Sequence, residues 1–227
     1  GEDLEGVLAR LREGDQDAVA RWTPRRLLTV FVQICNAVAY AHERGVVHRD
    51  LKPANVMLGR FGEVLLMDWG VARLRDQLGR LAGPDDSTDE AEITLPESGI
   101  NMTMDGTTVG TPGFMAPEQA AGDQERVGPL SDVWSLGAIL YNILTLQHAF
   151  GAENVLQLIY VAAQSEPQDP RERAPERDIP DEIAAICLRA LNRSPEDRPT
   201  GALELASAVE DFLEGAQRKE AASAHVA

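Results

Sequence analysis

Residues 48–58 read HRDLKPANVML, and they place a short polar segment between two apolar runs, 46–47 and 56–58. Apolar runs of this kind are expected to be buried, whereas the charged and amide side chains between them are not. A loop that is anchored by buried residues at both ends can aim its polar side chains. The stretch therefore predicts a functional loop on a rigid scaffold.

A long helix is predicted before this loop and a β-hairpin after it. Thr23 and Pro24 suit the start of a helix, Gly45 suits its end, and one face between them is striped by Leu27, Phe31, Ile34, Val38 and Ala41. Two short aliphatic runs, 56–58 and 64–67, are joined by the turn sequence Gly-Arg-Phe-Gly at 59–62. The loop thus lies between a helix and a hairpin.

The rest of the chain is predicted to be mainly α-helical. Residues 133–144 are apolar around most of a helix, which indicates a buried one, and further amphipathic helices are expected near 154–164, 181–192 and 200–214. A frayed tail is expected from residue 217. Between 75 and 110, eight acidic residues stand against two arginines without any period, which is typical of a long or disordered loop.

Composition limits the possible partners and the compartment. The net charge of −16 argues against a nucleic acid or an anionic membrane as the main partner. The most apolar run, 27–41, is too short and too polar to span a bilayer. Cys35 and Cys187 lie in apolar periodic segments, so we expect buried free thiols and a reducing, cytoplasmic location.

The side chains of the loop suit phosphoryl transfer. That reaction requires an acidic group near the acceptor hydroxyl, a cation near the phosphate, and oxygen ligands for Mg²⁺. Asp50, Lys52, Asn55 and Asp68 supply this set, and the hairpin returns Asp68 toward the other three. An isolated Asp-x-Lys pair is more often a solvated turn, so the hypothesis depends on all four residues together.

Five segments, HRDLKPAN, MDWG, GTPGFMAPE, SDVWSLG and PEDRPT, resemble the successive signatures of Hanks-type Ser/Thr protein kinases, particularly bacterial ones. They occur in the order of that family and cover the chain from about residue 4 to residue 212. The resemblance implies the helical C-terminal lobe of an α+β kinase-like fold, with a small β-hairpin at the catalytic loop.

The resemblance also implies residue roles and the use of ATP and Mg²⁺. Asp50 would orient the substrate hydroxyl, Lys52 would contact the γ-phosphate, and Asn55 and Asp68 would hold Mg²⁺. Met57 would form an apolar floor for the adenine. Lys52 together with Thr111, a substrate-docking position, resembles the Ser/Thr branch, so the expected partners are proteins with Ser or Thr acceptors.

Three further positions match scaffold residues of the family. Glu118 and Arg198 would form a buried ion pair that ties the end of the activation segment to the helical lobe. Asp132 would accept backbone N–H groups from the turn at His48 and Arg49.

A phosphorylation switch is implied by the same comparison. Arg49 and Arg73 would form a basic pocket for a phosphate on Thr107 or Thr108. The alternative is that both arginines are solvated or pair with loop carboxylates. The activation segment would run over 68–118, with an acidic insert at about 75–106.

The chain lacks two elements that such kinases use. It contains no G-x-G-x-x-G sequence, and its lysines are Lys52 and Lys219. We therefore expect residues 1–214 to be a C-lobe that works with an N-lobe outside this sequence, and 215–227 to be a flexible tail. A membrane anchor elsewhere in the protein and a dimer for trans-autophosphorylation stay open.

Two competing functions remain. A pseudokinase-like docking module would fit the missing lobe, although a scaffold has no need of Asp50, Asn55 and Asp68. A small-molecule phosphotransferase can share the Asp-to-Asn loop, but GTPGFMAPE, a peptide-docking element, argues against it.

Overall fold

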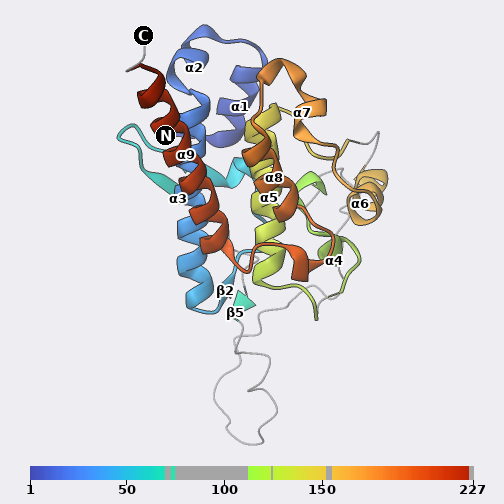
Figure 1. Ribbon diagram of the computed structural model, residues 1–227. Coiled ribbons are helices and arrows are strands. Elements are labelled where there is room, and N and C mark those ends of the chain that lie inside the picture. The colour runs from blue at the N-terminus through green and yellow to red at the C-terminus, as the bar shows by residue number, and fades with distance from the viewer. Residues whose placement is uncertain (70–72, 75–111, 124, 152–154, 225–227) are drawn as a thin grey trace, which may run out of the picture.

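The computed structural model of the protein describes residues 1–69, 73–74, 112–123, 125–151 and 155–224 (Figure 1). Its α-helices are α1 (Leu4–Arg12), α2 (Gln16–Arg21), α3 (Pro24–Glu43), α4 (Pro117–Ala120), α5 (Pro129–Thr145), α6 (Val155–Gln164), α7 (Pro170–Arg173), α8 (Asp181–Ala190) and α9 (Ala202–Ala224). Its strands are β1 (Glu2–Asp3), β2 (Val46–Val47), β3 (Val56–Leu58), β4 (Val64–Leu66) and β5 (Arg73–Leu74). Short 3-10 helices are η1 (Pro53–Asn55), η3 (Pro112–Phe114), η4 (Pro175–Arg177) and η5 (Pro195–Asp197). The fold is mainly α-helical, as the sequence predicts.

Helix α3 begins and ends where its sequence indicates. The hydroxyl of Thr23 accepts a hydrogen bond from the backbone N–H of Arg26 at 3.3 Å, and Pro24 occupies the first turn. The helix ends at Glu43, and Gly45 follows with φ of 75°. The glycine adopts this left-handed conformation without the penalty that a Cβ would bring. Its turn leads the chain into the strand that precedes the polar loop.

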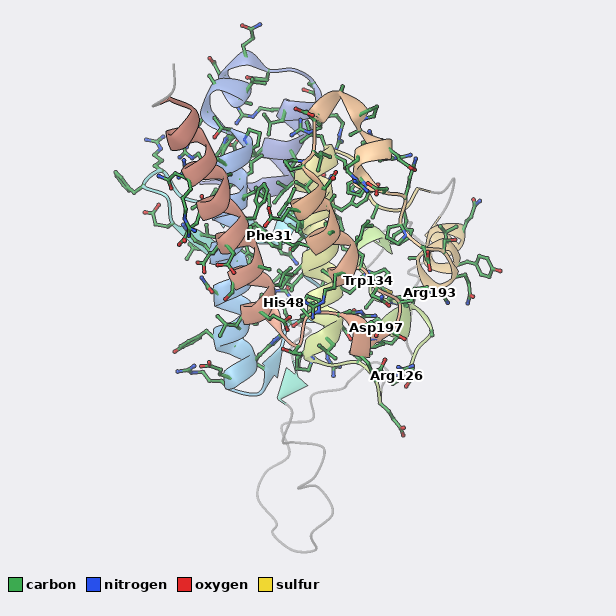
Figure 2. The ribbon with its side chains drawn as sticks, viewed as in Figure 1. Phe31, His48, Arg126, Trp134, Arg193 and Asp197 are labelled. Carbon is green, nitrogen blue, oxygen red and sulfur yellow. The ribbon has the colours of Figure 1, made fainter. Side chains whose placement is uncertain are left out.

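Helix α5 is the centre of the core. It packs against α3, α8 and α9, and every residue from 131 to 145 is buried (Figures 1 and 2). A Cβ on Gly137 would lie 2.9 Å from the Cβ of Ala190, so the glycine permits the close approach of α5 and α8. Phe31 from α3 and Trp134 from α5 both lie in the interior, where neither is exposed (Figure 2).

Two small sheets frame the polar loop. Strands β3 and β4 form the predicted antiparallel hairpin, with Val56 opposite Leu66, and Gly62 in its turn has φ of 95°. The structure adds two strand pairings to the hairpin that the sequence predicts. Strand β1 adds a third strand beside β3, and β2 pairs with β5 in a separate sheet. Strands of two residues contain too little alternation to be recognised in a sequence.

Predicted helix ends agree with the structure at α6 and α8 to within two residues. Helix α9 continues past residue 214 to Ala224, so residues 217–224, for which we predicted a frayed tail, are helical. The division into a domain over 1–214 and a flexible tail stays a prediction.

Sequence reasoning missed α1 and α2, although each has an N-cap that could have been recognised. The carboxylate of Asp3 accepts from the N–H of Gly6 at 2.7 Å, and that of Asp15 accepts from Ala18 at 2.9 Å. Both helices are short, which hides their periodicity.

The cysteines are as predicted: Cys35 and Cys187 are buried free thiols. Burial raises the pKa of both thiols above the ordinary value. Within the ranges that the structure describes, no helix combines the length and the apolar character needed to cross a membrane.

Candidate active site

The polar loop runs from β2 to β3 and is anchored at both ends by buried residues. Val47 and Leu51 are 4% and 1% exposed, and Val56 is fully buried. Arg49 has φ of 70°, a left-handed conformation that a residue with a Cβ seldom adopts. The loop therefore turns sharply just before Asp50.

Three of the predicted residues meet within this loop. The ammonium of Lys52 contacts Oδ2 of Asp50 at 2.8 Å. The Nδ2 group of Asn55 donates to the backbone carbonyl of Asp50 at 2.9 Å and lies 3.4 Å from Oδ2 of the same residue. Asn55 is 7% exposed, whereas Asp50 and Lys52 are only partly buried. The carboxylate is thus fixed from within the loop and still reachable from outside.

His48 joins this loop to the end of the hairpin. Its imidazole is buried, and Nε2 contacts the carbonyl of Met67 at 3.1 Å while Nδ1 accepts from the N–H of Asp50 at 3.3 Å. The two contacts assign the proton to Nε2. The ring also lies 4.6 Å from that of Trp69, whose indole N–H donates to the carbonyl of Leu66. His48 is thus fully engaged as a structural residue.

Asp68 follows Met67 directly and is placed beside the loop by its neighbour's backbone. The N–H of Met67 donates to the carbonyl of Asn55 at 2.8 Å, and its carbonyl meets His48. Asp68 itself has φ of 60° and an exposed side chain. The backbone that leads to Asp68 is therefore held against the loop, while the Asp68 side chain is exposed.

The chemistry of the Asn55 and Asp68 side chains fits Mg²⁺. Because Nδ2 of Asn55 is engaged by Asp50, the amide orientation leaves Oδ1 as the oxygen available to a ligand. In the described part of the chain, no three His, Cys, Asp or Glu side chains form a metal cluster. A site of one carboxylate and one amide, completed by phosphate oxygens and water, is the kind that Mg²⁺ prefers.

Asp132, near the start of α5, holds the backbone of the loop through hydrogen bonds. Its Oδ2 accepts from the N–H of His48 at 2.8 Å, and its Oδ1 accepts from the N–H of Arg49 at 2.8 Å. The carboxylate is completely buried and also contacts Nε2 of His42 at 2.7 Å. Three partners thus satisfy a buried carboxylate that holds the turn before Asp50.

Glu118 and Arg198, for which we predicted a buried pair, form a two-pronged ion pair at 2.8 and 2.9 Å. Their side chains are 3% and 0% exposed. Burial alone would raise the pKa of the Glu118 carboxyl, but the hydrogen bonds and charge of Arg198 outweigh it, so that the pKa lies below its ordinary value.

Other predicted positions are only partly described. The backbone of Arg73 pairs with that of Val47 in the β2–β5 ladder. Arg73 therefore lies beside the strand that ends two residues before Arg49. Thr107, Thr108 and Thr111 lie outside the described residues, as does the acidic insert.

Met57 lies opposite Leu65 in the hairpin and is partly buried. Leu65 is 60% exposed and Phe61, in the turn, is 94% exposed. Leu65, the cross-strand partner of Met57, is therefore an exposed apolar residue, and the role of Met57 as an adenine floor stays a prediction.

Sequence reasoning missed two residues that touch this site, His42 and Gln119. The Nε2 group of Gln119 donates to the backbone carbonyl of Arg49 at 2.9 Å. Gln119 and Arg49 are far apart in the sequence, and no local pattern signals such a contact. His42 lies in the last turn of α3, where a histidine is equally suited to a helix end.

Comparisons with known proteins identify the family of this chain. A family model described as the protein kinase domain matches residues 5–211. A serine/threonine-protein kinase PknD of Protochlamydia amoebophila is 39% identical over 192 residues, which cover 83% of this chain and 18% of that protein. The PknD of Chlamydia trachomatis is 37% identical over 194 residues, covering 84% and 20%, and that of Chlamydia caviae is 33% identical over 219 residues, covering 95% and 22%.

The chain spans about a fifth of the length of these relatives. In contrast, the family model matches most of the residues of this chain. From this match, and from relatives that carry kinase names, we conclude that the chain belongs to the protein kinase domain family, in the bacterial Ser/Thr branch of Hanks type.

Proposed function

We propose that the protein containing this chain transfers the γ-phosphoryl group of ATP to Ser or Thr hydroxyls of protein substrates. The observation that carries the proposal is the arrangement of Asp50, Lys52 and Asn55 within one loop. The family match and the names of the relatives support the same reaction.

The loop residues have separable tasks in this mechanism. Oδ2 of Asp50 is engaged by Lys52, so the carboxylate keeps a fixed orientation and offers Oδ1 to the proton of the substrate hydroxyl. Lys52 places a positive charge beside the group that is transferred. Asn55 and Asp68 would hold Mg²⁺, which neutralises phosphate charge when it is bound. Positioning and charge neutralisation are the main needs of this loose transition state.

We further propose that activity requires a second lobe that is not within this chain. The sequence has no glycine-rich phosphate loop, and the hairpin presents its apolar residues to the outside. The 227 residues alone should therefore bind ATP weakly and transfer little phosphate. A cytoplasmic location is proposed from the two buried reduced thiols.

Regulation by phosphorylation belongs to the same proposal. A phosphate on Thr107 or Thr108 would be held by Arg49 and Arg73 and would order the segment that precedes α4. The β2–β5 ladder supports this, since it brings the backbone of Arg73 close to the start of the catalytic loop.

The test is phosphate transfer from labelled ATP to a protein substrate by the whole protein that contains this chain. Asp50→Asn should lower the rate by about two to four orders of magnitude, because the group that accepts the proton is lost. Asp211→Asn, at an exposed position on α9, is the matched control and should leave the rate unchanged. Full activity of Asp50→Asn would refute the role given to Asp50, whereas no phosphate transfer by the unchanged protein would favour a scaffold role instead.

A further inference from the structure

The peptide unit between Arg49 and Asp50 is held in an unfavourable conformation. Arg49 has φ of 70°, a conformation that is costly for a non-glycine residue and persists only where the surrounding structure imposes it. The direction in which the Asp50 side chain leaves the backbone depends on this peptide. Groups that impose the conformation therefore decide where the carboxylate points.

Three side chains grip the backbone on the two sides of this peptide. Asp132 accepts from the N–H groups of His48 and Arg49, both at 2.8 Å. The imidazole of His48 accepts from the N–H of Asp50 at 3.3 Å. On the opposite side, Gln119 donates to the carbonyl of Arg49 at 2.9 Å. The peptide is thus fixed at its N–H by the loop itself and at its carbonyl by α4.

The orientation of Gln119 is determined by its own contacts. Its Oε1 accepts from the backbone N–H of Ala116 at 3.3 Å, while Nε2 serves Arg49. If the amide were turned by 180°, its NH₂ group would face the N–H of Ala116 and its oxygen would face the carbonyl of Arg49, so neither hydrogen bond could form. Gln119 can therefore meet both partners in a single orientation.

Helix α4 is itself fixed in place, which gives Gln119 a stable base. The residue before it, Glu118, is bound on both carboxylate oxygens by the buried Arg198 and also accepts from the hydroxyl of Ser131 at 2.7 Å. Just upstream, the carbonyl of Phe114 accepts from the hydroxyl of Ser135 at 2.8 Å. The stretch from η3 to α4 is therefore attached to α5 at two points.

We propose that Gln119 is a positioning residue that couples α4 to the catalytic loop, by holding the Arg49 carbonyl and so fixing the direction of the Asp50 side chain. The role in phosphate transfer rests on the proposed function, whereas the mechanical coupling does not. When α4 is seated, the strained turn is held from both sides. When α4 shifts, the carbonyl loses its donor and the Asp50 carboxylate is no longer aimed.

The coupling is tested by amide hydrogen exchange on the protein that contains this chain, which requires no activity. Gln119→Met keeps the length of the side chain and removes both hydrogen bonds, and Gln119→Glu removes the donor alone. Loss of the hydrogen bond to the Arg49 carbonyl, which both variants share, should speed exchange at residues 48–52 by about fivefold, while α3 and α5 keep their protection. Gln33→Met, on the exposed face of α3, is the matched control and should change neither.

Kinetics provide the second measurement. Both variants should lower kcat for peptide phosphorylation by about ten- to a hundredfold through misplacement of Asp50, with KM for ATP unchanged. If the whole protein transfers no phosphate at all, the proposed function fails, and exchange at 48–52 still decides the coupling.

Two outcomes would overturn the proposal. Unchanged exchange at 48–52 in Gln119→Met would show that the residue only fills space. An equal loss of protection in the loop and in α5 would show that Gln119 supports the fold as a whole and has no particular effect on the loop.

Discussion

Removal of Arg198 is expected to have a large effect on stability. The side chain is completely buried, and its guanidinium lies 5.1 Å from the ring centre of Trp134. Besides both oxygens of Glu118, it donates to three backbone carbonyls, those of Asn192, Leu130 and Arg193. Every nitrogen of the group therefore has a partner, and among these partners the Glu118 carboxylate is itself buried.

The magnitude follows from what Arg198→Met would leave behind. A buried carboxylate without its counter-charge costs about 3–5 kcal/mol. A domain of this size is stable by about 5–15 kcal/mol, so the variant should lose a large share of its stability. Adding Glu118→Gln removes the stranded charge, and the coupling between the two substitutions should be about 2 kcal/mol.

The assay is urea unfolding, followed by both circular dichroism and tryptophan fluorescence so that a two-state transition can be verified. Arg126→Met is the matched control, because its ion pair with Glu196 is 52% and 69% exposed and should contribute less than about 1 kcal/mol. If Arg198→Met cost no more than Arg126→Met, burial of the pair would not govern its contribution, and the reasoning would be refuted.

Two further predictions concern acid and packing. The pKa of Glu118 is lowered in the folded state, so its contribution to stability is complete above the ordinary glutamate value of about 4.3 and is lost as the pH falls through the folded value. In urea titrations below about pH 4.3, the stability of Glu118→Gln should therefore fall less steeply with pH than that of the unchanged protein. Equal slopes of stability against pH would contradict the assignment. Gly137→Ala should cost about 1–3 kcal/mol, because the new methyl would crowd Ala190 at 2.9 Å. Gly215→Ala on α9, with no atom within 4 Å of its Cβ, should instead gain about 0.5–1 kcal/mol, and thermal melts that rank the two variants otherwise would exclude the overpacking argument.

Features set by local chemistry could be predicted from the sequence. The cap at Thr23, the glycine after α3 and the β3–β4 hairpin each depend on a few adjacent residues. The contents of the catalytic loop were recognisable for the same reason, because Asp50, Lys52 and Asn55 are close in the chain and meet without help from distant elements.

Features that depend on a distant partner could not be predicted from spacing. The β2–β5 pair is formed by two dipeptides that carry no alternation of their own. Gln119 looks like an ordinary polar residue of a short helix until its contact with Arg49 is seen. The pairing of Glu118 with Arg198 was anticipated, but from family resemblance, since nothing in either local sequence indicates the other.

The β2–β5 ladder has a mechanical consequence. It ties the chain just before His48 to the chain just after the hairpin, so the catalytic loop and Asp68 lie within one closed circuit of backbone. Asp68 is then tethered from both directions, by β4 on one side and by β5 on the other. Leu74 pairs directly with Val46, so a displacement of the chain at Leu74 acts on the strand that leads into the catalytic loop.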